Sequence, residues 1–163
     1  MTRNTIKRRP YVLWLAGPTG CGKTRLATSI DPDYWLSNQD LKWFDGYINQ
    51  KVAILDDFRH SDVPFQQILR ILDTYKLQLP VKGGFTTWNP WCIVVTCPRI
   101  PELEFKYKDQ FDNGASKQYE DLEQVTRRCT EIRSWDSIRN CWTWIKGTDL
   151  IGQVGFQAAC DQI

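Results

Sequence analysis

The feature that most constrains the fold of this chain is a glycine-rich segment with the Walker A pattern G-x-x-x-x-G-K-[ST]. It reads Gly17-Pro18-Thr19-Gly20-Cys21-Gly22-Lys23-Thr24. The apolar run 11–16 before it predicts a buried strand, and residues 24–30 after it can form a short helix. In this context the glycines let backbone N–H groups approach phosphate oxygens, helped by the helix dipole. The alternative, a glycine-rich turn with a chance lysine, is disfavoured by the four fixed positions and the preceding strand.

This loop indicates a site for ATP and Mg²⁺. We expect Lys23 to reach the β- and γ-phosphates and the Thr24 hydroxyl to hold Mg²⁺. Residues 51–57 predict an apolar strand ending in Asp56 and Asp57, a Walker B pattern. Asp56 would hold Mg²⁺ through its water shell, and Asp57 would polarise an attacking water. A solvated Asp-Asp turn is the alternative, which the upstream Walker A motif disfavours.

Composition sets further limits. A chain of 163 residues is expected to form one domain, and a net charge of +2 does not by itself indicate a nucleic-acid-binding protein. The basic residues among positions 1–10 predict a solvated linker or an oligomerisation segment. Six cysteines without a C-x-x-C pair and a single histidine disfavour a zinc site. Cys21 inside the phosphate loop favours a reducing compartment, and the lack of a long apolar run predicts a soluble intracellular protein without membrane contact.

Strands alternate with helices along the rest of the chain. Residues 64–72 have helical apolar spacing, and residues 77–81 and 85–88 flank Lys82-Gly83-Gly84 as a β-hairpin. Residues 91–96 predict another buried strand, and the charged stretch 104–121 predicts a loop followed by a helix that leads to Arg127-Arg128. We therefore predict an α/β fold of the P-loop NTPase type, with a mostly parallel central sheet flanked by helices. The expected divisions are 1–10 as linker, 11–146 as ATPase domain and 147–163 as a weakly patterned tail.

The order of these elements resembles the helicase domain of Rep proteins from circular single-stranded DNA viruses. That domain is circovirus-like and belongs to helicase superfamily 3, of the AAA+ type. The matching segments are Gly17–Thr24, Trp43-Phe44-Asp45-Gly46-Tyr47, Val52–Phe58, Lys82-Gly83-Gly84 and Arg127-Arg128. Taken one at a time, only the Walker motifs are specific signals. The occurrence of all five segments in this order within one small domain supports the resemblance strongly.

The resemblance implies a ring, a hexamer, that translocates on single-stranded DNA in the host nucleus with ATP at the subunit interfaces. Lys82, Gly83 and Gly84 would then place a cation in the central channel to hold DNA phosphate, instead of being a solvated turn. Trp88 and Phe85 could stack on bases, but we favour packing at the base of the hairpin. Arg127 and Arg128 would include an arginine finger; the alternative is a surface pair or an ion pair at the edge of the core.

Two departures from the family pattern are visible. Pro98 falls where the family has a polar sensor residue, and it offers neither a polar side chain nor an N–H. Thr96 is our candidate sensor; Arg99 could substitute, or water could be positioned differently. Rep proteins also carry an upstream nuclease domain with a histidine-rich metal motif. The single histidine, His60, excludes that module here, so the chain resembles the helicase part alone.

Three classes of function follow. The first is an ATP-driven DNA helicase domain. The second is a P-loop kinase of a nucleoside or another small molecule, against which the paired aspartates and the Lys-Gly-Gly hairpin argue. The third is a nucleotide-gated assembly module that does not unwind DNA, and its ATPase would not depend on single-stranded DNA.

Overall fold

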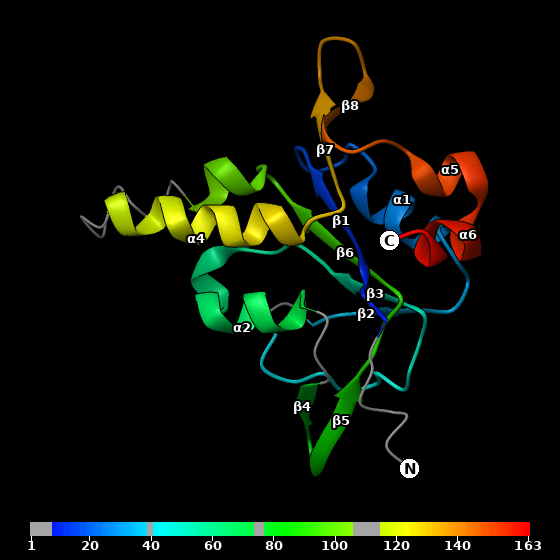
Figure 1. The fold of residues 1–163 in the computed structure, drawn as a ribbon, viewed down its shortest axis with the longest axis vertical. Coiled ribbons are helices and arrows are strands. Elements are labelled where there is room, and N and C mark those ends of the chain that lie inside the picture. Colours follow the sequence, from blue (N-terminus) through cyan, green and yellow to red (C-terminus); the bar gives the residue numbers. More distant parts are fainter. Residues whose placement is uncertain (1–7, 39–40, 74–76, 106–114) are drawn as a thin grey trace.

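A six-stranded sheet forms the centre of the molecule (Figure 1). The computed structural model describes residues 8–38, 41–73, 77–105 and 115–163. Five strands are parallel and the last, β8, is antiparallel. In sheet order they are β2 (Tyr34–Leu36), β3 (Val52–Leu55), β6 (Cys92–Cys97), β1 (Tyr11–Ala16), β7 (Glu131–Asp136) and β8 (Cys141–Lys146). The predicted α/β fold with a mostly parallel sheet is confirmed.

The central strands are apolar throughout because the sheet is covered on both faces. Every residue of β1, β3 and β6 is buried. Alternate residues of β1 face opposite ways, so Trp14 belongs to one core cluster while Leu13 and Leu15 belong to the other. Two cores, one on each face, therefore hold the sheet in place.

Helices cover the two faces in two groups (Figure 1). Helices α2 (Phe65–Ile71) and α4 (Ala115–Arg128) contribute to the core around Trp14. The short 3₁₀ turn η2 (His60–Asp62) precedes α2 in the chain. The other face is covered by α1 (Lys23–Ser29), α5 (Leu150–Val154) and α6 (Phe156–Asp161). Residues 147–163 are weakly patterned in the sequence, yet Ala159 and Cys160 are buried under the sheet. In the stretch 104–121, where a loop followed by a helix was expected, residues 106–114 lie outside the described residues, and α4 forms the helix that ends at Arg128.

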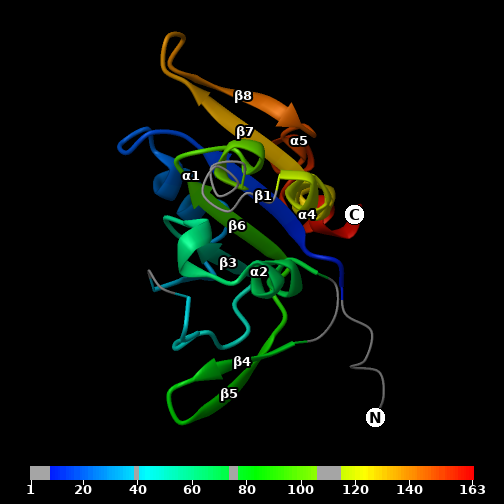
Figure 2. The same cartoon turned by 90° about the vertical axis from the view of Figure 1, so that its left-hand side faces the viewer.

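A two-stranded hairpin stands apart from the central sheet (Figure 2). It consists of β4 (Leu77–Val81) and β5 (Gly84–Trp88), as expected from the sequence. The chain reverses at Lys82 and Gly83, where Gly83 has a φ of 92° that glycine adopts without a side-chain clash. Trp88 is fully buried, and its Nε1 donates to the carbonyl of Ile71 at 2.9 Å. The expected packing role is thus confirmed for Trp88, whereas Phe85 is 74% exposed.

The buried carboxylate of Glu131 links strands β1, β7 and β8. Glu131 accepts hydrogen bonds from the Tyr11 hydroxyl at 2.5 Å, from Trp144 Nε1 at 2.6 Å and from Arg133 Nε. Arg133 also pairs with Asp149 at 3.0 Å, just before α5. Burial, followed by the contact with Glu131, raises the pKa of Tyr11 and keeps its hydroxyl a donor. This network ties β1, β7, β8 and the C-terminal helices together.

We predict that Glu131→Ala lowers the free energy of unfolding by about 3–5 kcal/mol, because the buried Arg133 guanidinium loses its buried carboxylate and keeps only the partly exposed Asp149. Urea denaturation followed by tryptophan fluorescence measures this. Arg139→Ala, in the exposed β7–β8 turn, is the control and should cost at most about 0.5 kcal/mol. Equal losses in the two variants would show that the Glu131 network does not stabilise the fold.

Candidate nucleotide-binding site

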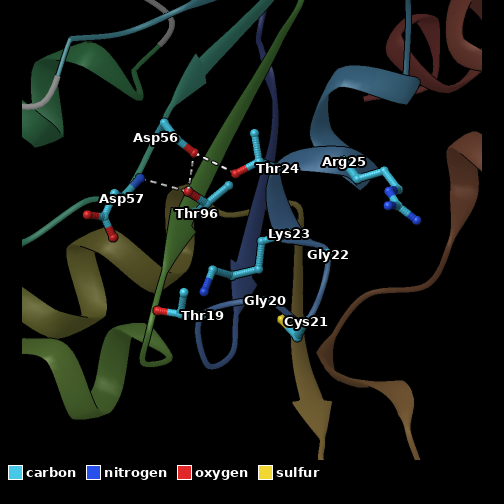
Figure 3. Close-up of a pocket in the computed structure, with 10 residues that line it drawn as sticks. All are labelled: Thr19, Gly20, Cys21, Gly22, Lys23, Thr24, Arg25, Asp56, Asp57 and Thr96. Carbon is cyan, nitrogen blue, oxygen red and sulfur yellow. Dashed lines mark hydrogen bonds between the residues drawn. The ribbon is translucent and has the colours of Figure 1, made fainter.

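The parallel register brings three strand ends together at one edge of the sheet. Ala16, the last residue of β1, lies beside Cys97 of β6, and Leu55 of β3 lies beside Val95. The Walker A loop leaves β1 there, and the paired aspartates follow β3. The strand ends and the loop enclose a cavity of about 590 Å³ (Figure 3). It is lined by Thr19, Gly20, Cys21, Gly22, Lys23, Thr24, Arg25, Asp56, Asp57 and Thr96.

The glycines of the loop are required by its geometry. Gly20 and Gly22 have φ values of 86° and 98°, which residues with a Cβ rarely adopt. A Cβ on Gly17 would lie 2.8 Å from Cys21 Sγ and 2.8 Å from Trp135 Cβ. The loop is therefore packed directly against β7. Trp135 was not predicted to take part in the site, since nothing in the sequence places it beside the loop.

Lys23 lies within the loop, at the start of α1. Its Nζ donates to the carbonyl oxygens of Gly17 and, at 3.2 Å, of Pro18. These bonds hold the ammonium group against the loop that lines the cavity (Figure 3). A cation at this point complements an anionic group such as phosphate.

Thr24, Asp56 and Thr96 form one hydrogen-bonded cluster on the opposite side of the cavity (Figure 3). Asp56 Oδ1 accepts from the Thr24 hydroxyl at 2.9 Å and from the Thr96 hydroxyl at 3.0 Å. The Asp56 amide in turn donates to Ser37 Oγ at 3.0 Å. The structure thus brings the two predicted Mg²⁺ ligands into contact and adds Ser37, which the sequence did not indicate.

Thr96 also fixes the backbone after β3. Its hydroxyl accepts from the Asp57 amide at 2.8 Å, and its carbonyl accepts from the Phe58 amide at 2.7 Å. Asp57 has a φ of 55°, an uncommon conformation for a residue with a side chain, and such strain is concentrated at functional sites. The Asp57 carboxylate forms an ion pair with Arg59 at 2.7 Å. Between the two candidates near Pro98, Thr96 lies in the cavity and Arg99 does not line it.

Arg99 belongs to a neighbouring network around a buried carboxylate. Glu104 accepts from the His60 amide at 2.7 Å, from His60 Nδ1 at 2.8 Å and from Arg99 Nε at 3.1 Å. Burial acts to raise the pKa of Glu104, but the bonds from His60 and the charge of Arg99 outweigh it and hold this pKa below its usual value. The network therefore stabilises the fold above the ordinary glutamate pKa, and this contribution is lost as the pH falls. It joins the turn after β3 to the segment after β6.

Arg127 and Arg128 lie far from the cavity. The Thr130 amide donates to the Val12 carbonyl at 2.8 Å, so the C-terminal end of α4 lies near the beginning of β1. The Walker A loop follows the other end of β1, at Gly17. Val12 and Gly17 are five positions apart along the chain, or roughly 16 Å. Arg128 pairs with Asp73 at 3.0 Å, while Arg127 is exposed. A cavity of about 230 Å³ lies here, lined by Arg9, Leu72, Asp73, Arg127 and Arg128.

Lys82, Gly83 and Gly84 occupy a third location, the tip of the β4–β5 hairpin. Lys82 and Phe85 are both exposed there. The predicted site residues therefore form three separate groups. One lines the large cavity, one lies at the opposite edge of the sheet and one lies on the hairpin.

Comparison with known proteins places this chain in a family. A family model described as RNA helicase matches residues 13–98. The replication-associated protein of Canary circovirus is 36% identical over 128 residues, which are 78% of this chain and 40% of that protein. That of Porcine circovirus 1 is 31% identical over 124 residues, 74% of this chain and 36% of that protein. The chain thus spans less than half the length of these relatives.

Among the described residues, no helix is both long enough and apolar enough to cross a bilayer. The matched segment carries the Walker A loop, the paired aspartates, the hairpin and Thr96. The chain therefore belongs to the RNA helicase family, as a superfamily 3 helicase domain of the type found in circovirus replication-associated proteins.

Proposed function

We propose that this domain hydrolyses ATP with Mg²⁺ and uses the energy to move along single-stranded DNA during viral replication. The observation that carries the proposal is the cavity that Lys23 lines together with the hydrogen-bonded cluster of Thr24, Asp56 and Thr96. The relatives are named replication-associated proteins. We infer that the domain works as the helicase part of such a protein, downstream of a nuclease domain and in the host nucleus.

The residues of the cavity fit a nucleoside triphosphate and its metal ion. Gly20 and Gly22 line the cavity with backbone in a conformation that disfavours a side chain, and Lys23 adds a positive charge. The Thr24 hydroxyl and the Asp56 carboxylate are hard oxygen donors already 2.9 Å apart, the kind of ligand that Mg²⁺ prefers. When bound, Mg²⁺ neutralises charge that develops on the phosphate oxygens.

The residues beyond Asp56 supply the remaining functions for hydrolysis. Asp57 is half-exposed and bordered by the cavity, so its carboxylate can accept a proton from an attacking water and orient it. Thr96 holds the Asp57 amide and Asp56 Oδ1 through one hydroxyl. We propose that Thr96 acts as the sensor, because a shift of Asp56 on nucleotide binding is transmitted through this hydroxyl to Asp57.

We predict that Lys23→Ala abolishes ATP turnover, because it removes the cation from the phosphates. Asp57→Asn should keep ATP affinity within about threefold of wild type and lower turnover at least a hundredfold, because the carboxamide cannot accept the proton. Steady-state hydrolysis and binding of a fluorescent ATP analogue measure the two effects. Ile138→Ala, in the exposed β7–β8 turn, is the control. Wild-type turnover in Lys23→Ala would contradict the assignment of this loop.

We also propose that each site is completed by a neighbouring subunit in a ring, a hexamer. Arg127 and Arg128 are at the opposite edge of the sheet from the Walker A loop, so neither reaches the cavity of its own subunit. Arg128 forms an ion pair with Asp73 and donates a hydrogen bond to the Gln124 carbonyl at 2.8 Å. We therefore propose Arg127 as the arginine finger, with Arg128 as its support. The arginines around the second cavity make this edge suited to a γ-phosphate from another subunit.

We predict that Arg127→Ala lowers turnover at least a hundredfold, since a finger contributes a thousandfold or more in related chemistry. Mixing this variant with Lys23→Ala should restore activity, because about a quarter of randomly formed interfaces then combine an intact loop with an intact Arg127. Turnover is measured against protein concentration for each variant and for the mixture. Arg139→Ala with Lys23→Ala is the control mixture, which should only dilute the wild-type interfaces. A mixture with no gain, and a wild-type specific activity that is flat on dilution to monomers, would contradict a shared site.

Lys82 and Phe85 give the hairpin two ways to hold a single strand. The lysine can contact a phosphate, and the exposed ring of Phe85 can stack on a base without reading sequence. The two contributions respond differently to salt, because only the phosphate contact releases counterions. The family model is named for RNA, so RNA of the same sequence is the natural comparison.

We predict that Lys82→Ala weakens binding of single-stranded DNA and flattens the dependence of affinity on salt. The log–log slope should fall by about 0.7 for each phosphate that the variant no longer neutralises. Phe85→Ala should weaken binding but leave the slope unchanged. Fluorescence anisotropy of a labelled oligonucleotide over a salt series separates the two. An assembly module without DNA movement would show neither effect and no stimulation of ATP hydrolysis by DNA. Tighter binding to the matched RNA would overturn the choice of DNA.

A further inference from the structure

One segment singled out by the sequence has no part in the proposed chemistry. Residues 43–47, Trp43-Phe44-Asp45-Gly46-Tyr47, lie between the Walker motifs and form neither helix nor strand. We call this segment the clamp. Phe44 and Tyr47 are buried, Asp45 is partly buried, and Trp43 is exposed. Its contacts indicate what it does.

The clamp holds both strands of the hairpin. The Phe44 amide donates to the Pro80 carbonyl of β4 at 2.8 Å, and the Tyr47 carbonyl accepts from the Thr86 hydroxyl of β5 at 3.1 Å. Trp88 packs against the two buried rings of the clamp, with centroid distances of 5.5 Å to Phe44 and 4.8 Å to Tyr47. The clamp therefore contacts both strands of the hairpin and its buried tryptophan.

The clamp also reaches the tip of the hairpin. Asp45 Oδ1 accepts a hydrogen bond from the backbone amide of Lys82 at 2.7 Å. Lys82 is the first residue of the two-residue turn, so this bond fixes the backbone from which its side chain extends. A carboxylate beside a DNA-binding lysine would by its charge alone repel phosphate. Its presence at the tip is accounted for by the hydrogen bond.

The same segment is tied to the nucleotide site through β2. Trp35 of β2 donates from Nε1 to the Asp45 carbonyl at 2.9 Å and stacks on Phe44 at 5.6 Å. Two residues further along, the Ser37 hydroxyl accepts from the amide of Asp56 at 3.0 Å. A continuous set of bonded groups thus joins the turn at Lys82 to the Walker B carboxylate.

We propose that Asp45 is a positioning residue for the Lys82 contact with DNA, and that the clamp and β2 connect this contact to Asp56. The inference rests on the proposed DNA-binding function of Lys82. It assigns a role to the clamp that differs from core packing, because it requires the Asp45 side chain and acts through the side chain of Lys82.

The test measures affinity for a labelled single-stranded oligonucleotide in four variants: Asp45→Ala, Asp45→Asn, Lys82→Ala and the double variant Asp45→Ala/Lys82→Ala. Asp45→Ala should weaken binding about tenfold, which corresponds to about 1.4 kcal/mol. Asp45→Asn should bind at least as tightly as wild type, because its amide oxygen accepts the same bond and it carries no charge that repels phosphate. In the double variant Asp45→Ala should add little to Lys82→Ala, since the two act on one contact.

Asp136→Ala is the matched control, because Asp136 accepts from the Ile138 amide at 2.9 Å in the turn of the other hairpin. It should leave DNA affinity unchanged, and the thermal midpoints of all variants report folding. Binding as tight as wild type or tighter in Asp45→Ala, with Lys82→Ala impaired, overturns the positioning role and leaves the DNA contact standing. Additive losses in the double variant also overturn it. Normal binding by Lys82→Ala refutes the proposed DNA contact itself, and the positioning role falls with it.

Discussion

The parallel pairing of β1 with β6 is the constraint on which the rest of the structure depends. Because the two strands run side by side from Tyr11 and Cys92, they end together at Ala16 and Cys97. The Walker A loop and Thr96 are consequently at the same edge, and β3 adds Asp56 beside them. Strands paired in the antiparallel sense would put these groups at opposite edges. Five parallel strands can be this apolar because helices cover both faces of the sheet.

Much of this arrangement could be predicted from local patterns. The Walker A glycines, the strand before them, the paired aspartates and the β4–β5 hairpin all follow from short segments whose residue types dictate the backbone. The weakly patterned tail could not be predicted, since its short helices depend on burying Ala159 and Cys160 against the sheet rather than on their own periodicity.

The contacts missed by the sequence are those that join distant segments. Trp135 meets Gly17 across more than a hundred residues, and Ser37 meets Asp56 only because β2 pairs with β3. Glu104 has no motif around it, yet it joins the segments that follow β3 and β6. Such positions are specified by tertiary packing, for which single-sequence patterns carry no signal. Thr96 was expected as the candidate sensor near Pro98, but its two hydrogen bonds to Asp56 and to the Asp57 amide could not be predicted from the sequence.

The distribution of charge makes assembly and DNA binding inseparable in the proposed function. A net charge of +2 gives a single subunit little general attraction for a polyanion, and the hairpin offers one lysine at its tip. One phosphate contact is weak at physiological salt, whereas several contacts along one strand add in free energy. In a ring, the subunit edge that carries Arg127 would face a neighbour's cavity while the hairpins converge on the strand. The same association would then complete the ATP site and raise DNA affinity, so neither activity is expected to be a property of the isolated domain.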